Sequence, residues 1–243
     1  MEKMKWWDRG WNPVQGCQKC SDGCKNCYAE CLVQKRSKAE KNISFDIHIN
    51  EKQIKKKFDD TNEFVFVCSQ SDLFHHSISE DVLDEIFDKM VDCKSKKFAV
   101  CTKRSAYMRE YFNNFNLPEK DYSNVIFGVT VESNKYKSRI DDLLNTDRIK
   151  YRFLSLEPML EEMDIESYLK TKLIDWVIVG CESGENHRKC ENKWIENVVK
   201  QCKTYDIPVF VNNITSNTSN EITDVLEGSN VNYREFFDDF KIH

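Results

Sequence analysis

The amino-acid sequence predicts a single α/β domain over residues 1–243, built as a partial or irregular (β/α) barrel of about six to seven parallel strands. Several apolar runs are hydrophobic throughout rather than alternating, which is typical of parallel strands buried on both faces. Segments with helical periodicity lie between these runs. The strands begin roughly 22 to 35 residues apart, the length of one strand–helix unit, and about seven strands fall short of the eight in a closed barrel.

The expected strands are short and rich in β-branched and aromatic residues. A strand before the first cysteine ends at a glycine, and six later strands follow at regular intervals. In chain order the expected strands are Trp11–Gly16, Phe64–Cys68, Phe98–Thr102, Val125–Val131, Tyr151–Ser155, Trp176–Gly180 and Ile207–Val211.

The expected helices place their apolar residues three or four positions apart, as Val82, Ile86 and Met90 show. Residues 39–60 predict a long connection carrying a short helix, and residues 213–230 predict a polar loop. A final helix over Tyr233–Phe240 is expected to pack back through its aromatic side chains. The remaining expected helices are Asn26–Lys38, Asp81–Val91, Ser105–Phe112, Lys135–Leu144 and Trp194–Cys202.

Composition indicates a globular protein, with 40% apolar and 32% charged residues among 243. No apolar run reaches transmembrane length, and the first residues lack the apolar core of a signal peptide. We therefore expect a cytoplasmic protein with no membrane partner. The formal net charge of −5 gives no global attraction to nucleic acid, although a local basic patch remains compatible with it.

Four thiols occur within eleven residues, at Cys17, Cys20, Cys24 and Cys27. Cysteines clustered in this way in a reducing compartment indicate a metal site more often than disulfides, and soft thiolates select zinc, copper(I) or iron–sulfur clusters. The loop therefore predicts a metal centre. Scattered cysteines are expected to be small buried hydrophobes for the most part, and these are Cys68, Cys93, Cys101, Cys181, Cys190 and Cys202.

Polar or ionisable side chains follow each expected strand, at the end where parallel β/α folds build their sites. Three of these side chains, Glu132, Glu157 and Glu182, are carboxylates expected to be buried together at one end of the sheet. Buried carboxylates need cationic partners, and the candidates are Lys103, Arg104 and Arg188. The alternative interpretation is a set of ordinary loop charges and rim ion pairs. His75 is a candidate proton donor or acceptor, or simply lies at the start of the next helix. The strand-end residues are Asp72, His75, Lys103, Arg104, Glu132, Ser155, Glu157 and Glu182.

The cysteine spacing leaves two kinds of metal site open. Four thiolates favour a tetrahedral zinc, whereas three thiolates from one loop favour an iron–sulfur cluster with one iron free to bind a ligand. The spacing Cys20-x3-Cys24-x2-Cys27 resembles the cluster motif of the radical S-adenosylmethionine (radical SAM) superfamily. In that superfamily an aromatic residue usually precedes the last cysteine, whereas here Tyr28 follows it. The superfamily motif also follows the first strand of a partial barrel.

A closer resemblance is to an uncharacterised phage-associated family with radical-SAM-like features. That family's C-x6-C-x2-C motif corresponds to Cys17, Cys24 and Cys27, so either Cys17 or Cys20 is the third ligand. The family tends to end its last strand with Lys-Gln, where this chain has Asn212 and Asn213. The segments that carry the resemblance are Trp11–Cys17, Gly23–Glu30, Val65–His75, Thr102–Arg104, Gly128–Glu132, Arg152–Pro158 and Ile174–Gly184.

The resemblance implies a 4Fe-4S cluster, S-adenosylmethionine as cofactor, and an electron donor such as flavodoxin or ferredoxin. The expected substrate is a small molecule or a nucleotide, with nucleic acid as a further partner class. An alternative is a nucleic-acid-acting or interaction protein with a structural zinc or iron–sulfur site. Cofactor binding is assigned to Asp72, Lys103, Glu132, Ser155 and Glu157, and catalysis to His75, Arg104 and Glu182.

Overall fold

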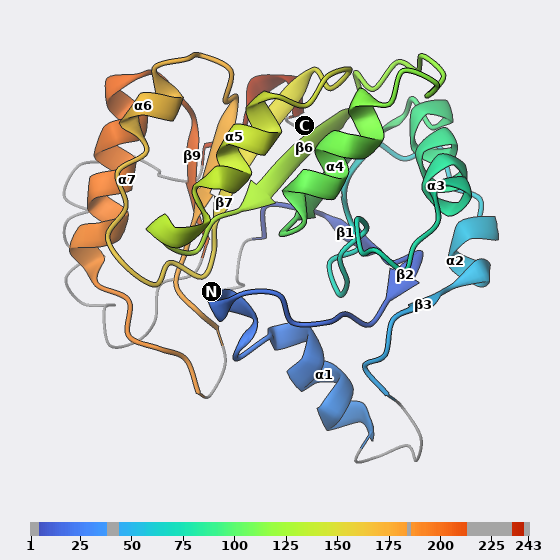
Figure 1. Ribbon diagram of the computed structural model, residues 1–243, viewed down its shortest axis with the longest axis horizontal. Helices are drawn as coiled ribbons and strands as arrows, with labels where there is room; N and C mark the ends of the chain where they lie inside the picture. Colours follow the sequence, from blue (N-terminus) through green and yellow to red (C-terminus); the bar gives the residue numbers. More distant parts are fainter. Residues whose placement is uncertain (1–4, 38–43, 184–185, 213–234, 241–243) are drawn as a thin grey trace.

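Seven parallel strands form one curled sheet, a half-barrel, in a computed structural model that describes residues 5–37, 44–183, 186–212 and 235–240 (Figure 1). The strand order follows the chain from β1 through β4 to β9. The prediction of a parallel α/β sheet of six to seven strands is thus confirmed. The strands are β1 Arg9–Trp11, β4 Glu63–Val67, β5 Lys96–Thr102, β6 Val125–Thr130, β7 Tyr151–Leu156, β8 Trp176–Val179 and β9 Val209–Val211.

The first strand differs from the prediction. Arg9–Trp11 pairs with β4 at the edge of the main sheet, so this strand lies before the expected range and overlaps it at one residue. The next residues leave the sheet: β2, Val14–Gln15, pairs antiparallel with β3, His48–Ile49, in a separate two-stranded sheet. Gly16 has a φ of +74° and lies against the backbone of Asp46, and the chain turns there into the cysteine loop.

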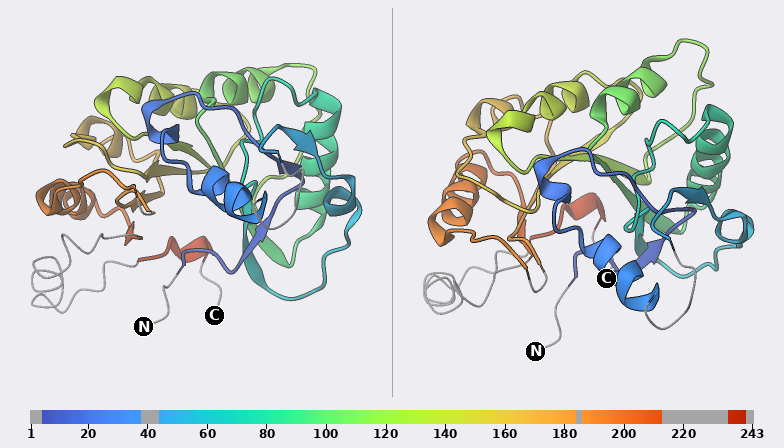
Figure 2. Two further views of the ribbon diagram at one scale, coloured as in Figure 1. Left: turned by 90° about the horizontal axis from the view of Figure 1, so that it is seen from below. Right: turned by 60° about the horizontal axis from the view of Figure 1, so that its bottom comes forward.

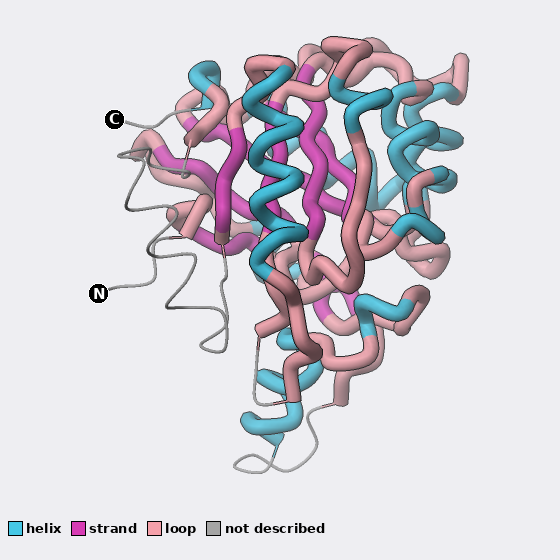
Figure 3. Tube along the Cα trace, turned by 90° about the vertical axis from the view of Figure 1, so that its left-hand side faces the viewer, coloured by secondary structure: helices cyan, strands magenta, loops and turns pink. Residues whose placement is uncertain are grey.

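Helices cover the convex face of the sheet, and the N-terminal segment and the C-terminal 3-10 helix lie on its open side (Figure 2). Helix α7, at the left in Figure 1, runs alongside the strands when viewed from that side (Figure 3). Helix α1 projects away from the body of the domain (Figure 1). The helices are α1 Tyr28–Ser37, α2 Glu51–Lys55, α3 Glu80–Asp92, α4 Ser105–Asn113, α5 Ser138–Leu144, α6 Glu166–Leu169 and α7 Asn192–Thr204.

Two apolar clusters lie on the two faces of the sheet. The larger cluster fills the space between the strands and the outer helices, as the helical periodicity predicts. The second is aromatic and includes Trp6, Phe153, Trp176 and Phe210, which come from the N-terminal segment, β7, β8 and β9. A Cβ at Gly128 would lie 2.4 Å from the Phe153 ring, so glycine at this position makes room for that ring.

The end of the chain packs as expected, but not as the expected helix. Phe236, Phe237 and Phe240 contact the aromatic cluster, while the helical part of the described segment is one 3-10 turn, Asp238–Phe240. Residues 213–234, which include Asn213, the whole of the expected loop over residues 213–230 and the first two residues of the expected final helix, lie outside the described residues. Helix α6 was not predicted. None of the helices in the described part of the chain has both the length and the apolar character needed to cross a membrane.

Candidate functional site

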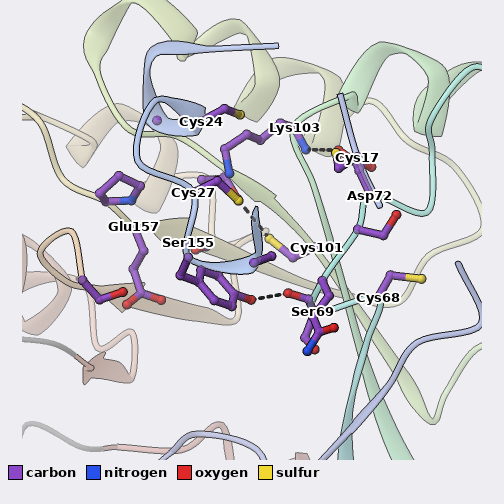
Figure 4. Close-up of a pocket in the computed structure, with 18 of the residues that line it drawn as sticks. Cys17, Cys24, Cys27, Cys68, Ser69, Asp72, Cys101, Lys103, Ser155 and Glu157 are labelled. Carbon is purple, nitrogen blue, oxygen red and sulfur yellow. Dashed lines mark hydrogen bonds between the residues drawn. The ribbon is translucent and has the colours of Figure 1, made fainter. Parts of the chain in front are cut away.

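A cavity of about 450 Å³ opens at the carboxyl ends of the strands, between the sheet and the cysteine loop. Its volume falls within the range of ligand sites in proteins. Seven of the eleven cysteines line it, and they come from the loop and from three strand ends (Figure 4). The lining cysteines are Cys17, Cys20, Cys24, Cys27, Cys68, Cys101 and Cys181.

The four loop cysteines face this cavity from a short segment that contains one 3-10 turn, Asp22–Cys24, followed by α1. A hydrogen bond from the Cys20 thiol is the main cause that lowers the pKa of Cys24 to about 4, and the nearby Lys103 ammonium lowers it further. The same hydrogen bond raises the pKa of Cys20. In the described parts of the chain, no three Cys, His, Asp or Glu side chains already surround a single metal position.

The first anchor of the loop is the ion pair between Asp72, after β4, and Arg104, after β5. Their closest atoms, Oδ2 and Nη1, lie 3.1 Å apart. The other oxygen of Asp72 accepts a hydrogen bond from the Thr102 hydroxyl at 2.6 Å. Arg104 in turn donates through Nη2 to the backbone oxygen of Gln18 at 2.9 Å, and its Nη1 lies 4.0 Å from the Cys17 sulfur. Arg104 thus connects two strand ends to the start of the loop.

The second anchor is a buried ion pair after β6. Glu132 is fully buried, and its Oε2 accepts from Arg139 Nη1 at 2.7 Å. The same guanidinium nitrogen donates to the Thr130 carbonyl and the guanidinium carbon lies 4.3 Å from the centre of the Tyr136 ring. The second oxygen of Glu132 accepts the backbone N–H of Gly23 at 3.2 Å. A Cβ at Gly23 would lie 2.9 Å from that oxygen, so the loop approaches this closely because the residue is glycine.

The third anchor follows β8. Glu182 forms an ion pair with Arg188 and also accepts the Arg188 backbone N–H at 2.8 Å. Its Oε2 accepts the side-chain amide of Asn26 at 2.9 Å, directly before Cys27. Arg188 donates through Nη1 to the backbone oxygen of Asp22 at 3.0 Å. This anchor therefore holds the loop at two points.

These three anchors give the contacts that several of the expected site residues make in the structure. Asp72, Glu132 and Glu182 each form an ion pair with an arginine. Each also accepts a further hydrogen bond, from Thr102, Gly23 and Asn26 respectively. These contacts fix the cysteine loop at the carboxyl ends of the strands. Arg188 pairs with Glu182 as expected, whereas the partner of Glu132 is Arg139, which the sequence analysis did not name. The three arginines lie on different connections, so no short motif marks them as a set.

Besides Asp72, Arg104 and Glu182 of the anchors, further polar side chains line the cavity. Lys103 is half-buried, and its ammonium donates no hydrogen bond within the described residues. Ser155 and Glu157 come from β7 and the residue after it, and Asn212 follows β9. Burial raises the pKa of Glu157 to about 7, against the opposing effects of the Asn212 hydrogen bond and the Lys103 charge. The cavity therefore contains a cation and a carboxyl that titrates near neutrality.

His75 does not line the cavity, although it was expected to take part in catalysis. It is 2% exposed, and its Nδ1 accepts the backbone N–H of Ser77 at 3.2 Å. Burial lowers its pKa, with the Arg104 charge as the next cause. Glu132 also lies outside the lining, beneath Gly23.

Cys68 and Cys181 are buried, as expected, but the sequence did not indicate that they and Cys101 line the cavity, nor that aromatic side chains form one wall of it. Cys101 lies in β5 and precedes Lys103, the residue directly after that strand, by two positions, and both side chains line the cavity. Figure 4 shows the side chains of Cys27 and Cys101 pointing toward one another. In β4, residues two positions apart also share a face, so Phe66 lies on the concave face with Phe64 and lines the cavity. The aromatic residues that line the cavity are Trp6, Trp7, Tyr28, Phe45 and Phe66.

Comparison with known proteins identifies the family of this chain. The sequence model of the family described as "Protein of unknown function (DUF5131)" matches residues 1–235, and the chain belongs to that family. Neither the curated proteins nor the solved structures contain a match to it.

Proposed function

We propose that this member of the family is a radical-SAM-like iron–sulfur enzyme that begins radical chemistry on a small molecule or a nucleotide. The observation that carries the proposal is the arrangement of the cysteine loop. Three ion pairs from different strand ends hold one four-cysteine loop over an open cavity. A purely structural metal clip has no need of a cavity beneath it. The resemblance to a phage-associated group and the cytoplasmic location belong to the same proposal.

The donor set fits an iron–sulfur cluster in its chemistry. Thiolates are the ligands that such clusters take, and Cys24 has the lowered pKa of a thiolate. Cys24 and Cys27 would hold the cluster together with Cys20 or Cys17. The direct hydrogen bond between Cys20 and Cys24 favours Cys20 as the third ligand. Cys17 instead lies beside Arg104, at 4.0 Å.

Held by Cys24, Cys27 and either Cys20 or Cys17, such a cluster would supply the one-electron reduction of S-adenosylmethionine that starts radical chemistry. The protein's own contribution is binding, orientation and exclusion of water. Lys103 would offer its ammonium to the methionine carboxylate, and Ser155 would offer a hydroxyl to the ribose, since both line the cavity. The aromatic wall excludes water from the reacting space. A flavodoxin or ferredoxin is the proposed electron donor.

The test is purification without oxygen, followed by assays of iron, sulfide and visible absorbance. A brown protein that forms 5′-deoxyadenosine from S-adenosylmethionine and dithionite supports the proposal. A colourless protein with one zinc per chain refutes it and favours the alternative, an interaction or nucleic-acid-acting protein with a structural zinc. Weak salt dependence of any nucleic-acid binding would then count against phosphate contacts.

Single cysteine variants identify the ligands. Cys24→Ser and Cys27→Ser are expected to lose the iron. Of Cys17→Ser and Cys20→Ser, the variant of the true third ligand is expected to lose it as well. Cys31→Ser is the matched control because Cys31 is exposed on α1, four residues after Cys27, and does not line the cavity. Loss of iron in this control would show that the loss is not specific to ligands.

A further inference from the structure

The cavity has an aromatic wall that suits a flat ring. Trp7 and Phe66 both line it and are only partly buried, with ring centres 5.3 Å apart. Trp6 packs behind them, with its centre 4.6 Å from that of each ring, and fixes their positions. Aromatic faces stack on nucleobases, and such stacking alone does not select among the bases. Selection therefore depends on the polar groups in the same cavity.

Glu157 and Asn212 present two hydrogen-bond acceptors to this space. The Asn212 amide nitrogen donates to Glu157 Oε1 at 2.8 Å, which joins the two side chains. Within the described residues, no group donates to Glu157 Oε2 or to the amide oxygen of Asn212. A half-buried pair of acceptors leaves a desolvation cost that a ligand with two donors would remove. Both residues line the cavity, together with the aromatic wall.

We propose that the cavity binds a guanine base, with its face against either Trp7 or Phe66, whose ring planes are tilted by 59°, and with the Glu157–Asn212 pair on its Watson–Crick edge. This inference rests on the proposed function and names its substrate class, a guanine nucleoside or nucleotide. Guanine presents two neighbouring donors, N1–H and the N2 amino group, which match two neighbouring acceptors. Adenine and cytosine place an acceptor beside their amino group, and uracil and thymine have one ring donor between two acceptors.

The charge of Glu157 makes this recognition dependent on pH. Ionised, the carboxyl accepts hydrogen bonds only, whereas its protonated form carries a donor that opposes N1–H. Burial raises its pKa to about 7. The groups that act on it are Asn212 and Lys103, which favour the ionised form, and the nearby Tyr28 and Cys101, whose charged forms oppose it. Guanosine should bind about tenfold more tightly at pH 8 than at pH 6.

The experiment is calorimetric titration of the full-length protein, purified without oxygen and with its iron assayed, using guanosine, inosine and adenosine. Inosine lacks the N2 amino group, which faces the neutral amide oxygen of Asn212, and is expected to bind about 3- to 10-fold more weakly than guanosine, the cost of one neutral hydrogen bond. Glu157→Gln alters the charged acceptor of N1–H and should weaken guanosine binding about 10- to 100-fold. Glu166→Gln is the matched control, because Glu166 is an exposed carboxylate on the same β7–β8 connection.

Four results would overturn the inference. The first is a dissociation constant of guanosine above about 1 mM. The second is equal affinity for guanosine and inosine, and the third is an unchanged affinity for guanosine in Glu157→Gln. The fourth is that S-adenosylmethionine displaces guanosine and that Glu157→Gln weakens the binding of both ligands equally. The last result would assign the base site to the cofactor. A protein without iron that still binds guanosine selectively refutes the proposed enzyme and leaves this site standing, so the two failures are distinguishable.

Discussion

Arg139→Met tests whether the anchor beneath the cysteine loop is a buried charge pair that the fold depends on. Glu132 is 0% and Arg139 7% exposed, and their closest atoms are 2.7 Å apart. The variant removes this contact and the hydrogen bond to the Thr130 carbonyl. Glu132 then remains buried with the Gly23 N–H as its described hydrogen-bond donor, 3.2 Å away.

The expected loss is set by that uncompensated carboxylate. Breaking a buried ion pair by removing one partner costs about 3–5 kcal/mol, a large part of the about 5–15 kcal/mol that a typical domain has in total. Glu132→Gln should lose a similar amount, because it leaves the Arg139 charge buried. The double variant has no buried charge, and its glutamine oxygen still accepts from Gly23. It should therefore lose less than about 5 kcal/mol, well below the sum of the single losses.

Urea unfolding measures these free energies by linear extrapolation, provided that the slopes of the variants agree. Glu51→Gln is the control: it breaks an exposed ion pair with Lys55 within helix α2 and should cost less than about 0.5 kcal/mol. A loss below about 1 kcal/mol for Arg139→Met, or strict additivity in the double variant, would refute the reasoning.

Three other predictions follow from close contacts and from one titrating group. Gly128→Ala places a Cβ 2.4 Å from the Phe153 ring and should cost about 1–3 kcal/mol in the same urea assay, so an unchanged midpoint would contradict the packing argument. Gly23→Ala places a Cβ 2.9 Å from Glu132 Oε1 and should reduce the iron retained per chain, whereas full retention would show that the loop adapts. Because the pKa of Glu157 is raised from 4.5 to about 7 in the folded protein, its ionisation destabilises the fold as pH rises through that range. The melting temperature of Glu157→Gln relative to wild type should therefore increase between about pH 5 and pH 8, and a constant difference would contradict this.

The strand pattern could be predicted because each central strand is buried on both faces, and burial leaves a continuous apolar run. Strand β6 is an example: all six of its residues are buried. The first strand could not be located in this way, because Arg9–Trp11 is a three-residue edge strand with a charge and a glycine. The expected final helix was wrong over its described residues, 235–240, for a related reason. Its aromatic side chains reach the core from residues without helical structure and from a single 3-10 turn.

The convergence of strand-end residues could also be predicted, since parallel strands end at one edge of the sheet. Which carboxylates are paired could not. Arg139 follows Glu132 by seven residues, beyond a 3-10 turn whose geometry brings it back, and no spacing rule marks that return. Glu157 forms no ion pair with an arginine of the described residues, and it received the same expectation as Glu132. The difference between a loop support and a cavity-facing group was therefore visible only in three dimensions.

The three anchors tie the cysteine loop to the ends of β4, β5, β6 and β8, so the loop spans more than half of the sheet. The position of the loop therefore depends on the curvature of the sheet, because a change in curvature would move the strand ends that hold the loop. Any ligand that fixes the loop also resists flattening of the half-barrel, and its binding free energy is added to the folding free energy by mass action. At 100 times its dissociation constant, such a ligand contributes about 2.7 kcal/mol.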